Sequence, residues 1–92
     1  MIVMKVKISE IRDNPKLNKV VDENSKIFKA LVESIKELGI VSPVVLEEHL
    51  NDFDIWSSFF TIIDGVQRVK AAKELGILEI PALVKVTHIN QV

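Results

Sequence analysis

The chain has 92 residues, enough for one domain, and its 48% hydrophobic and 27% charged residues exclude an intrinsically disordered protein. Its 12 Lys and Arg residues against 13 Asp and Glu residues give a formal net charge of -1. This balance argues against a protein that coats nucleic acid through a strongly basic surface. The absence of cysteine excludes disulfides, thiolate zinc sites and cysteine nucleophiles.

The first predicted element is a half-buried strand over residues 2–8, where apolar side chains alternate with others. Its two lysines interrupt the apolar N-terminus before a signal-peptide core could form. No apolar run reaches the ~20 residues that span a bilayer, so we expect a cytoplasmic protein without a membrane partner. Ser9 is expected to cap a short turn through residues 10–12, which ends before Pro15.

The second predicted element is an amphipathic helix over about residues 26–38, after a polar loop over residues 16–24. Its apolar residues recur at intervals of three and four, which places them on one face. Ser25 is expected to cap its start, and Gly39 suits its C-terminal end. We expect the apolar face of this helix to pack on the sheet.

The second half of the chain predicts three more strands and a second helix. The expected elements are strands over residues 44–46, 58–63 and 82–86 and a helix over about residues 66–75. The continuous apolar run of the first is typical of burial on both faces, and an acidic connection over residues 47–57 follows it. Pro81 is expected to precede the last strand. The fold class is α/β (α+β), a small mixed sheet of about four strands with two main helices, in one domain spanning residues 1–92.

The junction over residues 62–72 bears most directly on function, because a strand enters a helix there through Asp64 and Gly65. The first amides of a helix have no internal partner and carry the positive end of its dipole. Gly65 has no side chain to keep an anion from the backbone, while Gln67 and Arg68 add a donor and a positive charge. The junction is either a phosphate cradle or an ordinary strand–turn–helix connection capped by Asp64.

The loop after Asn14 is a second candidate region. Lys16 and Lys19 are candidates to meet phosphates of a nucleotide or of DNA, although such residues taken alone more often belong to an ordinary solvated loop. Together with Lys26 and Lys29 they form a candidate DNA-contacting patch.

No metal site is predicted. His49, Asp52 and Asp54 lie on one loop, but their spacing matches no firm ligand pattern. His88 is expected to be exposed rather than catalytic, and Trp56 is a candidate for stacking on a base.

Taken in order, these pieces resemble the ParB N-terminal (ParB-like nuclease) domain of the ParB/sulfiredoxin superfamily. The resemblance covers about residues 5–86. It is carried by four stretches: Ile8 to Ile11 with Asn14 and Pro15, Leu31 to Leu46, Ile63 to Gly76, and Ile80 to Val84. The combination is specific although each motif alone is not, and it favours the phosphate cradle over the ordinary connection.

The resemblance implies a role for residues 65–68, which match the Gly-Glu-Arg-Arg box that binds and helps to hydrolyse CTP with magnesium in ParB proteins. Gly65 and Arg68 are kept, whereas Val66 replaces the acid and Gln67 replaces the first arginine. A valine neither positions a water nor holds a metal. The resemblance therefore implies binding of a nucleoside triphosphate, CTP or ATP with Mg2+, more strongly than ParB-type CTP hydrolysis.

Three further residues complete the nucleotide-binding set that the resemblance implies. Lys70 keeps a positive charge where the family often has arginine. In the family's N-terminal box an arginine often follows the Asn-Pro pair, and here Lys19 stands in its place after Asn14. A lysine lacks the bidentate geometry of the arginine that it replaces.

Other members of the superfamily bear on catalysis. Sulfiredoxins have their cysteine nucleophile at the position of Val66, so that activity is excluded. Archaeal kinases that phosphorylate free serine have an Asp-Gly-His-His-Arg run, of which this chain keeps the aspartate, the glycine and the arginine. Asp64, and after it Glu10, are the candidate catalytic carboxylates.

The leading expectation is a nucleotide- or phosphate-binding ParB-like module that acts in plasmid or chromosome partition. The alternatives are a nuclease, NTPase or small-molecule kinase of the same fold, and a DNA-binding or protein-interaction module without nucleotide chemistry. Only six residues follow Val86, so we expect neither the helix-turn-helix nor the C-terminal dimerisation domain of partition proteins. DNA or a partition protein is the expected macromolecular partner, and a homodimer would add buried surface to a small domain.

Overall fold

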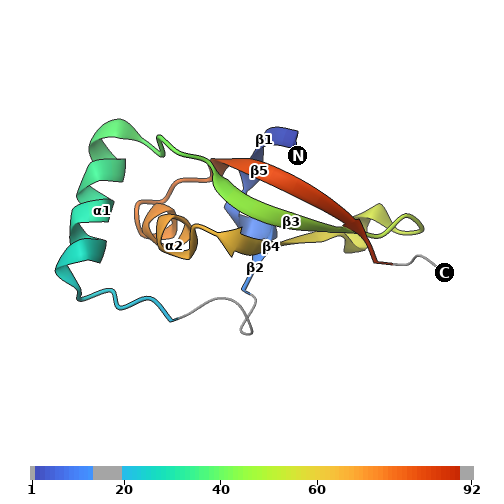
Figure 1. Ribbon diagram of the computed structural model, residues 1–92, viewed down its shortest axis with the longest axis horizontal. Helices are drawn as coiled ribbons and strands as arrows, with labels where there is room; N and C mark the ends of the chain where they lie inside the picture. Colours follow the sequence, from blue (N-terminus) through green and yellow to red (C-terminus); the bar gives the residue numbers. More distant parts are fainter. Residues whose placement is uncertain (1, 14–19, 90–92) are drawn as a thin grey trace.

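The computed structural model describes residues 2–13 and 20–89, which form a mixed sheet and two α-helices (Figure 1). The strands are β1 (Ile2–Lys7), β2 (Ile11–Arg12), β3 (Val44–Leu50), β4 (Phe59–Asp64) and β5 (Glu79–His88). The helices are α1 (Lys26–Leu38) and α2 (Val66–Glu74), and two 3-10 turns cover Ile8–Glu10 and Ile55–Ser57. None of the helices in this part of the chain is long and apolar enough to cross a membrane.

The order of the strands across the sheet is β1-β5-β3-β4-β2. The pairs β1–β5 and β3–β4 are antiparallel, whereas β3–β5 and β2–β4 are parallel. The expected α+β class with a mixed sheet and two helices is confirmed, but the described residues form five strands where about four were expected. The additional strand is β2.

β2 has two residues, which the sequence assigned to a turn. Ile11 and Arg12 instead pair with Phe60 and Thr61 of β4. The preceding 3-10 turn has no side-chain cap, so the expected capping role of Ser9 is wrong. A strand this short has no period of its own, and only its partner strand reveals it.

β3 is longer than expected and buries one face rather than two. Val44 and Leu46 are fully buried, whereas Val45 between them is only half-buried. The strand continues to Leu50, into residues that were expected to connect two strands. The expectation failed because Glu47 and Glu48 are adjacent residues that point to opposite faces of β3, where both stay half-buried rather than fully buried.

The polar face explains why β3 tolerates charged residues. Nε2 of His49 lies 2.8 Å from Oγ1 of Thr61, and Oγ1 of Thr87 donates to Oε2 of Glu47 at 2.8 Å. The His49 ring also stacks on the Phe59 ring, with 4.6 Å between their centroids. Side chains of three neighbouring strands therefore satisfy one another on this face.

β5 begins earlier than expected, so Pro81 lies inside the strand rather than before it. Pro81 is opposite Lys5 of β1, and pairing with β3 begins one residue later, at Ala82. At the proline the strand therefore has a partner on one side only, which is where a sheet tolerates a residue without an N–H group.

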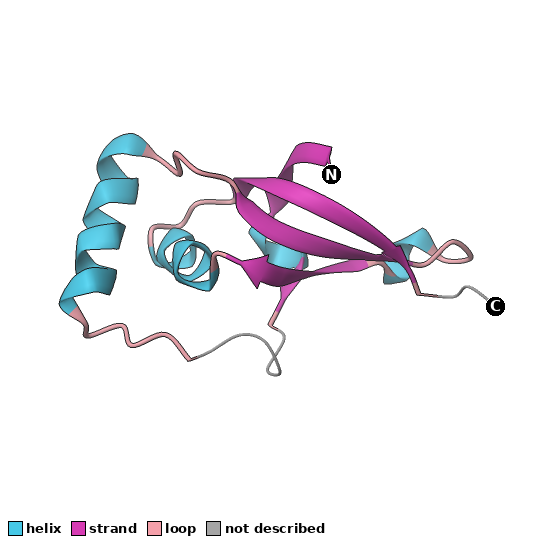
Figure 2. Cartoon of the chain, viewed as in Figure 1, coloured by secondary structure: helices cyan, strands magenta, loops and turns pink. Residues whose placement is uncertain are grey.

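The helices lie at one end of the sheet, with α2 between the sheet and α1 (Figure 2). Val69 and Ala72 of α2 pack in the main core with residues of all five strands. Phe28 and Ile35 of α1 form a second cluster with Ala71 of α2. The expectation that α1 packs directly on the sheet is therefore wrong.

The ends of α1 agree with the sequence signals. The Ser25 hydroxyl accepts a hydrogen bond from the Phe28 amide at 3.1 Å. Gly39 follows the last helical residue with a φ of 74°, in the left-handed region that glycine adopts readily. α1 therefore begins and ends at the residues expected.

Candidate functional site

The junction between β4 and α2 turns at Gly65, which has a φ of 108°. A Cβ atom added there would lie 2.6 Å from Cγ1 of Val44, which is buried in the core. Gly65 is also the N-cap of α2, and within residues 2–13 and 20–89 no side-chain hydrogen bond caps the first turn of this helix. The expected alternative role of Asp64 as the cap is therefore wrong, since Asp64 ends β4. The first amides of α2 remain available to an external acceptor.

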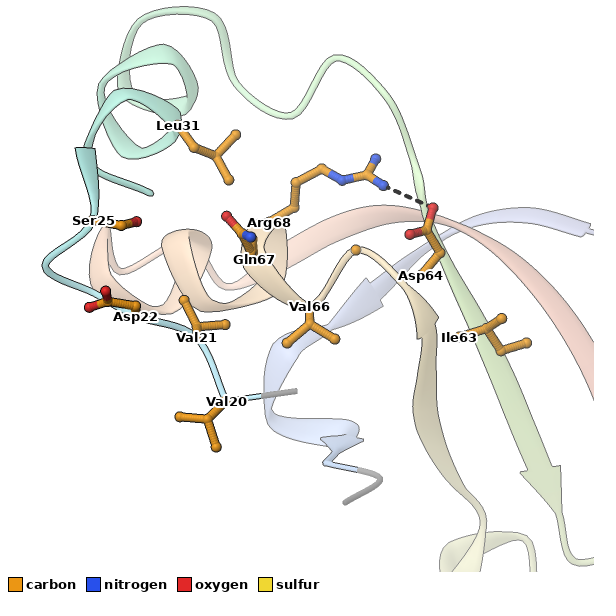
Figure 3. Close-up of a pocket in the computed structure, with 11 residues that line it drawn as sticks. Val20, Val21, Asp22, Ser25, Leu31, Ile63, Asp64, Val66, Gln67 and Arg68 are labelled. Carbon is orange, nitrogen blue, oxygen red and sulfur yellow. Dashed lines mark hydrogen bonds and ion pairs between the residues drawn. The ribbon is translucent and has the colours of Figure 1, made fainter. Parts of the chain in front are cut away.

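These amides border a pocket of about 700 Å³ (Figure 3). The lining combines the segment that leads into α1 with the β4–α2 junction: Val20, Val21, Asp22, Ser25, Leu31, Ile63, Asp64, Gly65, Val66, Gln67 and Arg68. Its volume falls in the range of ~300–1,000 Å³ that is usual for small-molecule sites. The pocket has an apolar side made of valine, leucine and isoleucine and a polar side at the start of α2.

Arg68 forms the most extensive contacts of the polar side. Its Nη1 donates to the carbonyl oxygens of Ser42, at 2.7 Å, and Pro43, at 3.0 Å. Its Nη2 lies 3.4 Å from Oδ2 of Asp64. The Arg68 side chain is 23% exposed and that of Asp64 is 72% exposed. Arg68 thus holds the start of β3 against α2 while its positive charge stays at the pocket wall.

Gln67 offers the most accessible side-chain donor of the lining. Its side chain is exposed, and the side-chain amide forms no hydrogen bond within the part of the chain that the structure describes. On the other side of the pocket, Oδ1 of Asp22 accepts the amide of Asn24 at 3.0 Å. Figure 3 shows Asp22 and Asp64 on opposite sides of the pocket, so the two carboxylates do not converge.

The structure separates the other predicted site residues from this lining. Nζ of Lys70 lies 3.0 Å from Oε1 of Glu23. The pKa of Lys70 is raised, because the Glu23 carboxylate accepts its hydrogen bond and attracts its charge. Glu10 lies in the first 3-10 turn, and Lys26 and Lys29 are exposed at the start of α1. Asn14, Lys16 and Lys19 lie outside the described residues.

Sequence reasoning missed the wall of the pocket that faces the junction. Val20, Val21 and Asp22 were assigned to a polar loop without a role, and Leu31 to the core face of a helix. No local signal marks these residues, because they form a wall only where α1 packs against α2.

The histidines and the acidic residues near the β3–β4 connection do not converge on a metal site. Asp54 caps the second 3-10 turn through Trp56, and Nδ1 of His88 lies 2.8 Å from Oδ2 of Asp52. No group of three His, Cys, Asp or Glu side chains is placed to hold a metal ion among residues 2–13 and 20–89.

A comparison against protein families identifies the family of the chain. The family described as the ParB N-terminal domain matches residues 1–92. The chain belongs to the ParB N-terminal domain family, as its motifs predicted.

Two relatives show how much of longer proteins this chain represents. It is 34% identical over 62 residues to a probable chromosome-partitioning protein ParB of Neisseria meningitidis, covering 67% of this chain and 20% of that protein. It is 31% identical over 84 residues to stage 0 sporulation protein J of Bacillus subtilis, covering 90% and 27%. The chain thus spans between 20% and 27% of the length of these relatives.

Solved structures with the same fold come from three kinds of protein. Truncated ParB from Caulobacter crescentus, complexed with CTP-gamma-S, has a TM-score of 0.73 at 20% identity and covers 92% of this chain and 44% of its own. Sulfiredoxin from Arabidopsis thaliana has a TM-score of 0.73 at 20% identity, covering 96% and 89%. A free serine kinase in complex with AMP has a TM-score of 0.66 at 19% identity, covering 90% and 30%. These similarities confirm the ParB/sulfiredoxin fold.

Proposed function

We propose that the chain is a nucleotide-binding ParB-like module in which the β4–α2 junction holds the phosphates. The observation that carries this proposal is the uncapped start of α2, whose first residues line a pocket of about 700 Å³ together with Gly65. An anion there meets unpaired amides at the positive end of a helix dipole. Similar structures of a ParB with CTP-gamma-S and of a kinase with AMP support the proposal.

Each residue of the junction has a role in this proposal. Gly65 adopts the positive φ with which the chain turns into α2, and the amides of Val66 and Gln67 donate to the phosphate. The Gln67 side chain adds a donor, and Arg68 supplies positive charge from the wall. Lys70 is assigned a longer-range electrostatic contribution, because its ammonium is engaged by Glu23.

The net charge of the lining indicates which further cations a bound nucleotide would need. The lining carries two carboxylates, Asp22 and Asp64, and one cation, Arg68. A polyphosphate therefore needs further positive charge, which we assign to Lys19 of the preceding loop and to Mg2+, while Asn14 is assigned an uncharged hydrogen-bond contact. An exposed carboxylate such as Asp64 suits Mg2+, which keeps several waters and bridges phosphates to one or two protein oxygens.

We propose binding rather than catalysis as the primary activity. The nuclease, NTPase and kinase alternatives need a set of carboxylates at the junction, whereas Asp22 lies on the opposite side of the pocket from Asp64 and Glu10 lies outside the lining. Partition of a plasmid or chromosome in the cytoplasm is the proposed setting, with DNA or a partition protein as partner. The lack of cysteine suits this reducing compartment.

Thermal unfolding tests the proposal with CTP, ATP, GTP and ADP, each with and without Mg2+. A nucleotide at about 100 times its Kd stabilises a protein by about 2.7 kcal/mol, which raises the Tm of a small domain by several degrees. We expect Gln67→Ala to reduce this shift without altering the Tm of the free protein. Lys73→Ala, on the exposed last turn of the same helix, is the control and should leave the shift unchanged.

Gln67→Ala is preferable to Arg68→Ala because Arg68 also bonds the carbonyls of Ser42 and Pro43. Absence of any shift with all four nucleotides would overturn the proposed function. A shift that survives both Gln67→Ala and Arg68→Ala would place the nucleotide elsewhere on the domain.

A further inference from the structure

The β3–β4 connection lies at the end of the sheet opposite α1 (Figure 1). It carries three large apolar side chains that are exposed to solvent. Phe53, Ile55 and Trp56, here called the apolar tip, are 86%, 67% and 94% exposed. Single exposed apolar residues are ordinary, whereas three within four consecutive positions are typical of an interaction site.

The apolar tip contributes little to the fold itself. None of its three side chains belongs to either hydrophobic cluster formed by the described residues. Exposed apolar side chains without packing partners are an aggregation liability. Their presence therefore calls for an explanation outside the folding of this domain.

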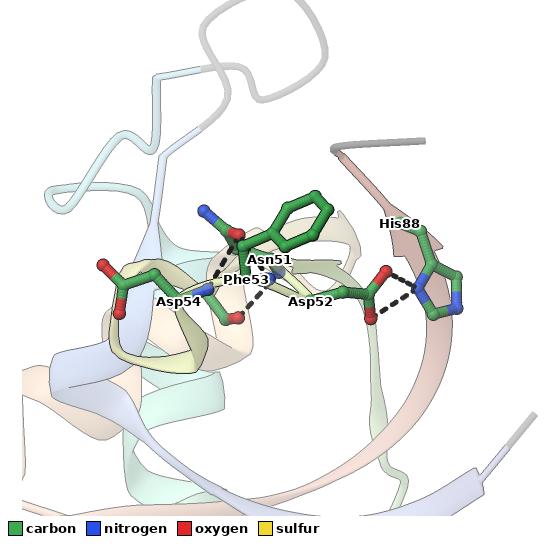
Figure 4. Close-up of polar contacts among 6 residues, drawn as sticks. Asn51, Asp52, Phe53, Asp54 and His88 are labelled. Atoms are coloured by element: carbon green, nitrogen blue, oxygen red, sulfur yellow. Dashed lines mark hydrogen bonds and ion pairs between the residues drawn. The ribbon is translucent and has the colours of Figure 1, made fainter. Parts of the chain in front are cut away.

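The backbone that carries the tip is held by side-chain hydrogen bonds (Figure 4). Oδ1 of Asn51 accepts the amides of Phe53, at 3.1 Å, and Asp54, at 3.0 Å. Oδ1 of Asp54 accepts the Trp56 amide at 3.2 Å, and its Oδ2 accepts the Ser57 hydroxyl at 2.6 Å. A partner would therefore meet an ordered backbone, which lowers the entropy lost on binding.

The tip is also tied to the sheet on both sides. Nδ1 of His88 at the end of β5 lies 2.8 and 3.0 Å from the carboxylate oxygens of Asp52 (Figure 4). The amide of Asn51 donates to Oγ of Ser58 at 2.9 Å, which closes the connection at its base. The three apolar side chains thus extend from a backbone that hydrogen bonds hold in place.

The charges around the tip indicate which kinds of partner could bind there. The connection that carries the tip, residues 51–57, includes Asp52 and Asp54 and contains no lysine or arginine. This acidic surrounding repels the phosphates of DNA and of anionic lipids. It also opposes contact with the same tip of a second copy, since like charges would face each other.

We propose that the apolar tip docks a basic segment of another protein that places apolar side chains against Trp56 and Phe53. Lysine or arginine residues of that segment would lie opposite the carboxylates that flank the tip. Aromatic residues at the centre of an interface commonly contribute most of its affinity. This docking surface is separate from the proposed nucleotide pocket and does not depend on it.

The experiment uses the intact chain as bait for a library of random peptides, with the Phe53→Ser variant as the comparison. We expect the enriched peptides to combine apolar residues with Lys or Arg. Trp56 is the single tryptophan of the chain, so binding of an enriched peptide should shift its emission to shorter wavelengths in a saturable way. Phe53→Ser should weaken this binding roughly tenfold or more, while Leu78→Ser, at an exposed apolar residue outside the tip, should leave it unchanged.

Each contrary result overturns the proposal. Peptides that are enriched equally on Phe53→Ser, or that are predominantly acidic, would show that the tip is not a basic-segment docking site, as would a lack of enrichment. An equal emission shift with phosphatidylcholine vesicles would assign the tip to a membrane surface. A shift caused by protein concentration alone would assign it to a second copy of the chain.

Discussion

At Gly65 the requirements of core packing and of backbone conformation coincide. The residue has a φ of 108°, and an added Cβ would meet Val44 at 2.6 Å. Val44 is fully buried between the sheet and α2, so it has no space into which to move. The glycine is therefore required by the fold even without a bound ligand.

This close approach predicts that Gly65→Ala is much more damaging than an alanine at Gly39. We expect a loss of about 2–5 kcal/mol for Gly65→Ala, from overpacking together with left-handed strain. Gly39 has a φ of 74° and open space around its Cβ position, so only the strain of about 1–2 kcal/mol applies there. Urea unfolding of both variants measures the difference, and equal losses would contradict a role for Val44.

Arg68 shows what sequence reasoning can assign to one residue and what it cannot. Its place in the motif indicated a positive charge near the helix start, and the structure does place it in the pocket lining. Its bonds to the carbonyls of Ser42 and Pro43 join residues 25 and 26 positions apart. Local sequence contains no signal for such contacts, since they depend on how β3 lies beside α2.

At the scale of elements, α1 is the outermost layer and depends on α2 for its packing. Phe28 and Ile35 are buried against Ala71 of α2, with no strand residue in their cluster. Ser25 caps the helix, but a cap contributes only about 1 kcal/mol. The helix should therefore be able to open while the sheet remains folded.

This arrangement predicts that Phe28→Ala destabilises α1 selectively. The truncation should cost about 3–5 kcal/mol of local stability. Amides of α1 should then exchange with solvent much faster, while those of β3 and β5 keep their protection. Ile27→Ala, at the exposed neighbouring position, should change stability by no more than about 0.5 kcal/mol. A uniform loss of protection across the sheet would show that α1 and the sheet unfold together.

The elements that could be predicted from sequence are those defined by local signals, whereas elements that depend on a distant partner could not. Local periodicity and a capping serine were sufficient to predict both ends of α1. A run of β-branched and aromatic residues was sufficient to predict β4 to within one residue at each end. β2, in contrast, depends on the pairing of Ile11 and Arg12 with β4. The Arg12 guanidinium also lies 4.1 Å from the centre of the Phe59 ring of β4. The junction half of the pocket was predictable for the same local reasons, whereas its opposite wall required the packing of α1 on α2.

At the scale of the whole molecule, the elongated shape separates the two proposed sites. The domain measures 46 × 25 × 20 Å, and the helices and the β3–β4 connection lie at opposite ends of its long axis (Figure 1). A nucleotide in the pocket and a protein on the apolar tip would therefore not compete for space.

This separation predicts that the two sites are thermodynamically independent. Phe53→Ser should leave the stabilisation by nucleotide unchanged to within about 0.3–0.5 kcal/mol, as is usual for distant sites without shared partners. Thermal unfolding of both proteins with and without nucleotide provides the comparison. A larger difference would reveal allosteric coupling through the sheet.

The strand order also has a consequence for how the chain acquires its structure during translation. β1 is synthesised first, yet its only partner is β5, the last of the described strands to leave the ribosome. The residues of β1 therefore have no strand to pair with until nearly the whole domain has left the ribosome. Contacts between residues so distant in sequence close slowly. We expect the sheet to be completed only after β5 has left the ribosome, and a chain truncated before β5 to leave β1 without a pairing partner.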